Sequence, residues 1–268
     1  MTLNSEKIAG DFLELASEQR LNILKNLEKE DLNISKLAKM LDASNPEVHR
    51  NVGRLSKSGL IVKNSDGNYG LTTYGYVALT QIPSISFISE NKDFFNSHTL
   101  NHIKPKFIQR IGALQSKKKI KGFVKVLEKW KEIHENADKF IYNILFEVPY
   151  SKDIIDIISN KLENNVQIKS IFSETAIISD DRKKIFEERN FQKYIVEEKL
   201  ERKISKNKSV GLLVTDKEAG VFFQRVDGEQ DFSEMLFSTE PEFRDWCMDY
   251  FEESWKNSTA FQESKLKE

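Results

Sequence analysis

Residues 44–57 combine hydrogen-bond donors with the spacing of a helix. Arg50, Arg54 and Lys57 share one face of a helix, since each residue turns the chain by about 100°. A donor-rich face of this kind can lie in the major groove of DNA, against the phosphate backbone. The residues of this helix predicted to contact DNA are Ser44, Asn45, Pro46, His49, Arg50, Arg54 and Lys57.

The opposite face of the same helix is apolar. Val48, Val52 and Leu55 fall together there and are predicted to point into a core. Ser44 and Glu47 have the spacing of a capping box, in which each side chain bonds a free backbone N–H at the start of the helix. Pro46 lies in the first turn, where its missing N–H costs nothing.

A shorter helix precedes this segment and a hairpin follows it. Residues 34–41 place apolar side chains at helical spacing, and Gly59 is a C-cap signal for the longer helix. Residues 60–62 and 69–71 are predicted strands joined by a tight turn at Asp66-Gly67. The hairpin residues predicted to contact DNA are Lys63, Asn68 and Tyr69. This order of elements predicts a winged helix-turn-helix.

The local charge is compatible with DNA, but a second interpretation stays open. Residues 44–65 hold four basic residues and one acidic residue, a net charge of +3. A positive surface is the minimum that a phosphate backbone requires. However, a three-helix core with a hairpin also serves as a protein-docking module, and the basic residues would then be an ordinary solvated face.

Composition bounds the other possibilities. The chain has 268 residues, enough for two domains, and a net charge of −1, so a nucleic-acid role must come from local patches. The lone cysteine, Cys247, excludes an internal disulfide and a cysteine-rich zinc site. There is no apolar run of about 18 residues and no signal-peptide pattern at the N-terminus, so a cytoplasmic protein without a membrane span is expected.

Helical segments are predicted on either side of the hairpin, and those that follow it suggest a dimer. Residues 6–15 and 18–28 are predicted helices, with Phe12, Leu13, Leu21, Leu24 and Leu27 as core candidates. Residues 83–135 are predicted to form a helical linker that pairs two subunits. Lysines at 117–121 are interpreted as an exposed loop, although contact with phosphate is an alternative.

The remainder predicts an α/β domain. Residues 139–148 and 166–172 are predicted strands separated by a helix, which favours parallel pairing. Two further strands, at 209–215 and 220–226, precede an aromatic-rich helix at 241–257. The predicted fold class is therefore α/β and multidomain, with a winged helix-turn-helix at 1–82, the linker at 83–135, an α/β effector domain with a mixed sheet at 136–258 and a flexible tail at 259–268.

Catalytic motifs are fragmentary. Phospholipase D chemistry needs two His-x-Lys-x4-Asp motifs, but only His102 and Lys104 have the first spacing, and Gln109 stands where the aspartate should be. The four histidines are too scattered for a metal site, and no phosphate-binding or nucleophile-elbow motif occurs. We therefore expect no enzyme activity, no metal and no cofactor, with a phosphodiester hydrolase as the least favoured alternative.

Several segments resemble known regulators. Residues 34–75, "ISKLAKMLDASNPEVHRNVGRLSKSGLIVKNSDGNYGLTTYG", resemble the ArsR-like winged-helix domains of archaeal transcriptional regulators, but lack the paired cysteines of metal-sensing members. The second half, including "LLVTDKEAGVFF" and "DFSEMLFSTEPEFRDWCMDYFEESW", is similar to the effector domain of the archaeal methanogenesis-regulator type and to phospholipase D-like domains of sugar-sensing regulators. The resemblance implies transcriptional regulation without naming a ligand.

Together these observations predict a homodimer that binds double-stranded DNA at specific sequences and senses a small-molecule effector through its second domain. A β-α-β layout would place the effector pocket at strand ends.

Overall fold

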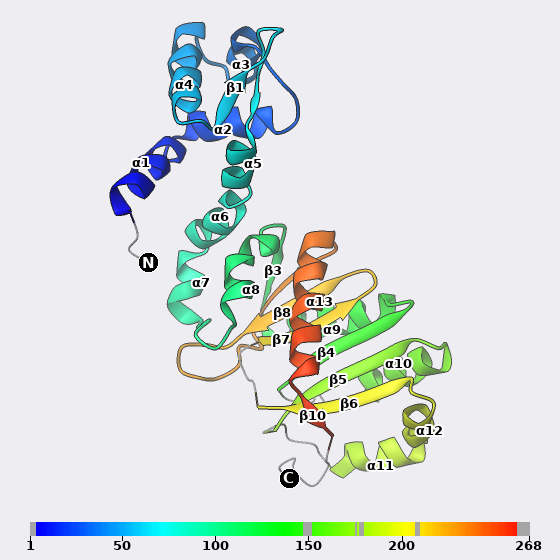
Figure 1. Ribbon diagram of the computed structural model, residues 1–268. Coiled ribbons are helices and arrows are strands. Elements are labelled where there is room, and N and C mark those ends of the chain that lie inside the picture. Colours follow the sequence, from blue (N-terminus) through cyan, green and yellow to red (C-terminus); the bar gives the residue numbers. More distant parts are fainter. Residues whose placement is uncertain (1–3, 147–151, 175, 177–179, 207–209, 262–268) are drawn as a thin grey trace. The chain divides into compact units, whose positions relative to one another are not determined.

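The computed structural model describes residues 4–146, 152–174, 176, 180–206 and 210–261 (Figure 1). The fold is α/β and multidomain, as predicted, with a winged helix-turn-helix followed by a domain built on a mixed sheet. The contacts divide the chain into two compact units, Met1–Ile82 and Pro83–Glu268.

The first unit packs helices and a two-stranded hairpin around one core. Its elements are α1 (Ser5–Leu15), α2 (Glu18–Leu27), α3 (Ile34–Met40), α4 (Asn45–Lys57), β1 (Ile61–Lys63), β2 (Tyr69–Leu71) and α5 (Thr73–Leu79). Val48, Val52 and Leu55 of α4 are almost completely buried, as their spacing predicted, and pack with Ile23 and Leu24 of α2. The apolar stripe therefore fixes which face of α4 meets solvent.

Local hydrogen bonds fix most helix starts in this unit. The side chains of Ser17, Asn33 and Thr72 cap α2, α3 and α5 by accepting backbone N–H groups at 3.5, 2.9 and 3.0 Å. The capping box predicted for α4 is wrong, because the Ser44 side chain makes no capping hydrogen bond. Pro46 has no N–H to offer, and the N–H of Glu47 donates to the backbone oxygen of Ser44 at 3.1 Å instead.

The first helix departs from the predicted core. Phe12 and Leu13 of α1 are 54% and 59% exposed, and no residue of α1 is buried. The prediction of these two residues as core residues is wrong, since α1 packs beside α2 along a short contact and leaves its apolar side chains facing outward.

The second unit is organised around an eight-stranded sheet in the order β10-β6-β5-β4-β7-β8-β9-β3. The strands are β3 (Lys118–Lys121), β4 (Phe140–Leu145), β5 (Gln167–Ser173), β6 (Leu200–Ser205), β7 (Val210–Thr215), β8 (Ala219–Phe223), β9 (Glu234–Ser238) and β10 (Thr259–Ala260). Strands β4, β5 and β6 pair in parallel, as predicted for the first two, and the other neighbours pair antiparallel.

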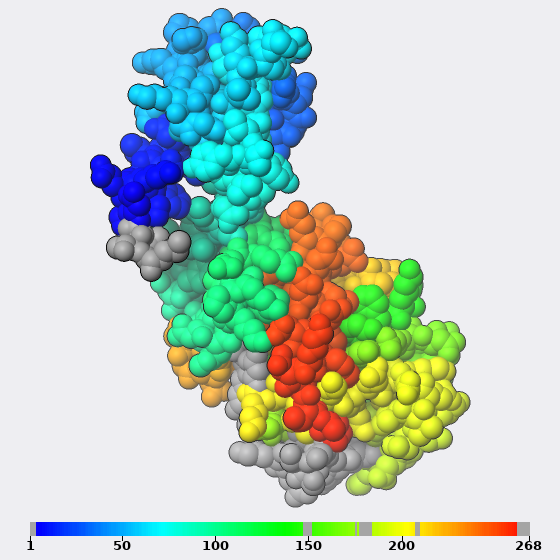
Figure 2. Space-filling view, viewed as in Figure 1, coloured from blue at the N-terminus to red at the C-terminus, as the bar shows by residue number. Residues whose placement is uncertain are grey.

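Helices cover both faces of this sheet. They are α6 (Ile82–Glu90), α7 (Lys92–Ser97), α8 (Pro105–Gln109), the 3-10 turn η1 (Ile111–Leu114), α9 (Phe123–Asn136), α10 (Lys152–Glu163), α11 (Asp180–Glu188), α12 (Phe191–Val196) and α13 (Pro241–Lys256). The aromatic stripe of α13, with Phe243, Trp246 and Tyr250, is buried in one core beside β7 and β8. Figure 2 shows α13 as the orange-to-red band across this unit. Trp130 and Ile133 of α9 belong to the other core, with residues of α10 and α12.

Two segments differ from the sequence interpretation. Lys118–Lys121 is an edge strand paired with β9, not an exposed loop, because Lys119 and Lys121 both reach Glu234 of that strand, at 2.6 and 2.9 Å. Residues 259 and 260, assigned to a flexible tail, pair with β6 as β10. Parts of the predicted strands, at 147–148 and 209, and the tail beyond 261 lie outside the described residues.

None of the helices in the described part of the chain is both long and apolar enough to cross a membrane.

An acid-sensitive ion-pair network joins α8 to α13. Glu253 contacts Lys104 and Lys106, the latter at 2.6 Å, and these hydrogen bonds lower the pKa of Glu253 from 4.5 to about 2. A carboxyl whose pKa is lower in the folded state stabilises the fold above pH 4.5, and this contribution is lost as pH falls toward 2. We expect Glu253→Gln to reduce the acid dependence of thermal unfolding in that pH range. Glu252→Gln, which removes a carboxyl from the same helix, should leave the dependence of thermal unfolding on pH unchanged. If the native protein, Glu253→Gln and Glu252→Gln all showed the same dependence on pH, the role given to Glu253 would be wrong.

Candidate nucleic-acid interface

Helix α4 presents every residue that the sequence assigned to its outer face. Ser44, Asn45, Pro46, His49, Arg50, Arg54 and Lys57 are all exposed. Asn51 holds the helix in place, since its Nδ2 donates to Glu47 O at 3.2 Å and to Gln19 Oε1, while its Oδ1 accepts from Arg20 Nη1 at 3.4 Å. The donor face is therefore carried by a helix anchored to α2.

Arg20 is the buried centre of this arrangement and was not singled out from the sequence. Only 7% of Arg20 is exposed, and its Nε and Nη2 donate to the backbone oxygens of Glu14 and Leu13, both at 2.7 Å. It thereby satisfies carbonyls at the end of α1 that the helix leaves free. No local pattern marks this role, because arginine on a helix is usually exposed.

Arg54 is paired with a carboxylate inside its own unit. Its Nε and Nη2 donate to Glu14 Oε2 and Oε1 at 3.0 and 2.7 Å, a two-pronged contact. Hydrogen bonding to Arg54 lowers the pKa of Glu14, against the effect of burial, and raises the pKa of Arg54. Glu14 therefore lowers the local charge of +3 to +2, and Arg54 must exchange this carboxylate for any phosphate that it binds.

Among the described residues, Arg50, Lys57 and Lys63 have no ion-pair partner. Lys57 ends α4 and Lys63 ends β1, so the unpaired cations span the helix and the hairpin. Helix α4 packs against β1, which keeps both elements in one unit. On the described helix α4 and hairpin, these three side chains carry positive charge that is available to a polyanion.

The wing is a short hairpin of two three-residue strands. Ile61 pairs with Leu71 and Lys63 with Tyr69, and Gly67 takes a φ of 82° that suits glycine in the turn. Asn64 Oδ1 accepts the N–H groups of Asp66 and Asn68 at 3.1 and 2.9 Å. Tyr69 is half-buried against the core, whereas Lys63 is exposed with its Nζ 5.9 Å from the Tyr69 ring. Lys63 is thus the more accessible of the two for contact with DNA.

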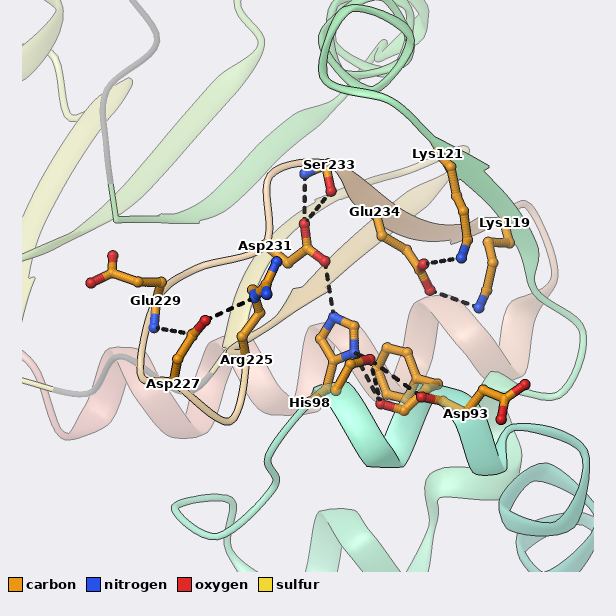
Figure 3. Close-up of polar contacts among 12 residues, drawn as sticks. Asp93, His98, Lys119, Lys121, Arg225, Asp227, Glu229, Asp231, Ser233 and Glu234 are labelled. Atoms are coloured by element: carbon orange, nitrogen blue, oxygen red, sulfur yellow. Dashed lines mark hydrogen bonds and ion pairs between the residues drawn. The ribbon is translucent and has the colours of Figure 1, made fainter.

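The second unit contains a buried histidine with a carboxylate partner (Figure 3). His98 Nε2 lies 3.2 Å from Asp231 Oδ2, and its Nδ1 lies 3.0 Å from both Phe94 O and Ser97 Oγ. Burial raises the pKa of Asp231, but hydrogen bonds from Ser233 and the charge of His98 outweigh it and lower the pKa. Serine, histidine and aspartate also form hydrolytic triads. Here, however, Nδ1 faces a backbone carbonyl, so the cluster ties α7 to the connection between β8 and β9.

The fragment of a phospholipase D motif is dispersed. His102 is exposed in a turn, while Lys104 is engaged with Glu253. The described residues include no group of three histidine, cysteine or acidic side chains that could hold a metal ion. The described part of the chain offers no assembled catalytic geometry in this region.

Cavities adjoin α9 in the second unit. One, of about 60 Å³, is lined almost wholly by apolar side chains from α9, β4 and β8. Another, of about 50 Å³, lies between the sheet and α9 to α12 and includes polar side chains. Trp130 and Leu145 line both cavities. The second extends along the middle of β4, β5 and β6 and so is not confined to strand ends.

Comparison with solved structures returns distant matches. TrmBL2, described as an archaeal chromatin protein with a novel mode of DNA binding, matches at 12% identity and a TM-score of 0.41, covering 91% of this chain and 94% of its own. Nuc from Salmonella typhimurium, a phospholipase D family member, matches at 12% identity and 0.37, covering 55% and 99%. An ArsR family transcriptional regulator matches at 22% identity and 0.25, covering 33% and 96%. Comparison with curated proteins finds no matching relative.

Family models match both units. The HVO_A0261 N-terminal domain matches residues 11–89, which include all of α4 and the hairpin. The middle domain of the methanogenesis regulatory protein FilR1 matches residues 124–257, half of the 268-residue chain. The chain therefore belongs to the regulatory family of the methanogenesis regulatory protein FilR1.

Proposed function

We propose that this regulator binds double-stranded DNA at specific sequences through α4 and the hairpin. The observation that carries the proposal is the division of α4 into a completely buried apolar face and an exposed face with Arg50 and Lys57. Arginine and lysine on an exposed helix supply both phosphate contacts and base-edge hydrogen bonds in a major groove. Lys63 on the wing adds a further cation.

The proposed active form is a homodimer. In the first unit, α1 exposes Phe12 and Leu13, and α5 exposes Tyr74 and Val77. Burial raises the pKa of Tyr74, and the carboxylate of Asp11 on α1 raises it further, so α1 and α5 lie close together here. The post-wing helix α6 also exposes Ile85 and Ile88. The exposed apolar side chains of α1 and α5 in the first unit, and separately those of α6 in the second unit, favour self-complementary contacts between two copies.

The second unit is proposed to sense a small molecule. Its cavities beside α9 provide partly enclosed, mainly apolar space, which is the usual character of small-molecule sites. A ligand can change DNA binding only if it favours one geometry of the dimer over another.

A second candidate function is docking of a protein partner. The contact of Arg54 with Glu14 shows that the exposed face of α4 accommodates a carboxylate. An acidic protein segment could occupy the same face without any nucleic acid.

Genome-wide occupancy of the tagged protein tests the proposal. Sharp peaks that share a palindrome, with half-sites about 34–36 Å apart, are expected for a dimer with two recognition helices. Arg50→Ala/Arg54→Ala should abolish these peaks, whereas Lys25→Ala/Lys29→Ala, which removes an exposed cation from α2 and another from the turn after it, should retain them. Diffuse occupancy that both variants share would contradict sequence-specific binding and favour the docking function.

A further inference from the structure

A row of polar side chains crosses the parallel part of the sheet in the second unit. Asn143 of β4 is in register with Ser170 of β5, and Ser170 is in register with Arg202 of β6. Residues directly paired across neighbouring strands point to the same face of a sheet. All three line the cavity of about 50 Å³ between this face and the helices (the strands and α10 to α12 are labelled in Figure 1).

Asn143 is buried without a hydrogen-bond partner for its side-chain oxygen. Only 4% of the residue is exposed, and within the described chain its Oδ1 is shielded from solvent and accepts no hydrogen bond. A buried polar atom normally has a partner, because leaving it without one loses the hydrogen bond that water supplied. Since Asn143 is one of the residues that line the cavity, an acceptor without a partner lies in the cavity wall and requires an N–H or O–H group.

The rest of the lining is mainly apolar, with a histidine and one arginine among the described residues. Ile155 and Ile158 of α10 and Phe186 and Phe191 form much of the wall. Burial lowers the pKa of His134 to about 4, so its ring is neutral at physiological pH. None of the described residues that line the cavity is acidic. Its cation, Arg202, lies over the rings of Phe186 and Phe261, 4.9 and 4.2 Å from their centroids.

We propose that this cavity is the effector site and that it binds a small uncharged molecule with an apolar body and one hydrogen-bond donor. The donor group bonds Asn143 Oδ1, and the Ser170 hydroxyl bonds the same end of the ligand. The apolar body packs against α10, Phe186 and Phe191. The regulatory meaning of the site rests on the proposed function, but binding itself does not.

The size of the cavity limits the ligand. A space of about 50 Å³ holds roughly three to five water molecules, at about 10–15 Å³ of this volume for each. It therefore suits a molecule of roughly four to six non-hydrogen atoms. Isobutyramide is a suitable probe, because it has a branched apolar body and a neutral amide donor. Isobutyrate has the same shape but carries a charge and has no hydrogen-bond donor. Benzene carries no charge and has no hydrogen-bond donor.

The test measures binding of each probe to the full chain by saturation-transfer NMR and by the shift in melting temperature, without DNA. Isobutyramide is expected to bind in the millimolar range and to raise the melting temperature, because a ligand that binds only the folded state stabilises it. Isobutyrate is expected to bind about tenfold more weakly, the ratio that corresponds to one hydrogen bond of about 1.4 kcal/mol.

Two variants separate a ligand-binding role of Asn143 from a structural one. Asn143→Leu keeps the volume and removes the unpartnered amide, so the melting temperature of the free protein should be unchanged or higher. Its affinity for isobutyramide should fall about tenfold, while benzene binding remains. Thr215→Val is the matched control, since Thr215 is equally buried on neighbouring β7 but donates to Glu218 O at 3.0 Å and accepts two backbone N–H groups. It should lower the melting temperature and leave the affinity for isobutyramide unchanged.

Four results would overturn the proposal. The first three are absence of isobutyramide binding to the native chain, binding of isobutyrate as tight as that of isobutyramide, and binding that Asn143→Leu does not weaken. Destabilisation by Asn143→Leu as large as that by Thr215→Val would also overturn it, by showing that a buried water satisfies the amide. Because none of these measurements includes DNA, their outcome is independent of whether α4 binds an operator.

Discussion

Arg50→Ala is expected to weaken binding to an operator duplex by about 10- to 100-fold, which corresponds to about 1–3 kcal/mol for a base-reading arginine. Arg50 is exposed on α4 and has no ion-pair partner in the described chain, so its guanidinium is available to DNA at no internal cost. Fluorescence anisotropy with operator and scrambled duplexes, at one fixed salt concentration, measures the effect. The loss should be larger on the operator than on the scrambled duplex.

The Glu14 contact supplies an internal control for this prediction. Arg54→Ala should cost less affinity than Arg50→Ala, because Arg54 gives up two hydrogen bonds to Glu14 before it can bind DNA. Glu14→Gln removes the carboxylate charge near the helix and should raise the affinity for both duplexes. If Arg50→Ala were neutral while Arg54→Ala abolished binding, the assigned roles of the two arginines would be wrong.

Gly75→Ala is expected to destabilise the winged unit severely. A Cβ at Gly75 would lie 1.9 Å from Leu60 O and 2.9 Å from Leu60 C, and these are backbone atoms that a rotamer change cannot move. The N–H of Gly75 also donates the capping hydrogen bond to Thr72 Oγ1, which in turn donates to Leu60 O at 3.2 Å. Overpacking typically lowers the free energy of unfolding by about 1–3 kcal/mol. Because the backbone atoms around Gly75 cannot move aside, we expect a loss at the upper end of this range.

Calorimetry of the full chain should show this as a fall in the melting temperature of the first unit by roughly 10–20 °C, at about 4–8 °C per kcal/mol for a domain of this size. Gly53→Ala is the matched control, because a Cβ added at this exposed helical position would have no atom within 4 Å. It should stabilise the unit by about 0.5–1 kcal/mol. A neutral Gly75→Ala would show that the junction between β1 and α5 adjusts easily.

Local signals predicted much of the first unit because they depend on neighbours in the chain. The apolar spacing of Val48, Val52 and Leu55 fixes which face of α4 is buried, and Asp66-Gly67 marks the turn between β1 and β2. The capping box at Ser44 was wrong because the N–H of Glu47, which such a cap uses, donates to the backbone oxygen of Ser44 and not to its side chain. A pattern gives the residues at both ends of a hydrogen bond without showing which acceptor the donor takes.

Tertiary contacts escaped the sequence because they join distant residues. Arg54 meets Glu14 across 40 positions, and the buried role of Arg20 depends on carbonyls of another helix. The edge strand of lysines at 118–121 depends on Glu234, more than a hundred residues later. Such pairings reflect which surfaces come together on folding, and no short window of residues contains that information.

The sequence by itself determined the winged helix-turn-helix, the exposed donors of α4, the parallel strands of the second unit and the resemblance to archaeal regulators. These follow from periodicity, turn chemistry and residue type, which act over a few positions. Only the tertiary structure decided that Glu14 neutralises Arg54, that α1 leaves Phe12 exposed and that Asn143 lies unpartnered in a cavity. Those features arise where separate elements pack together, because burial and pairing are properties of the assembled fold and not of the local chain.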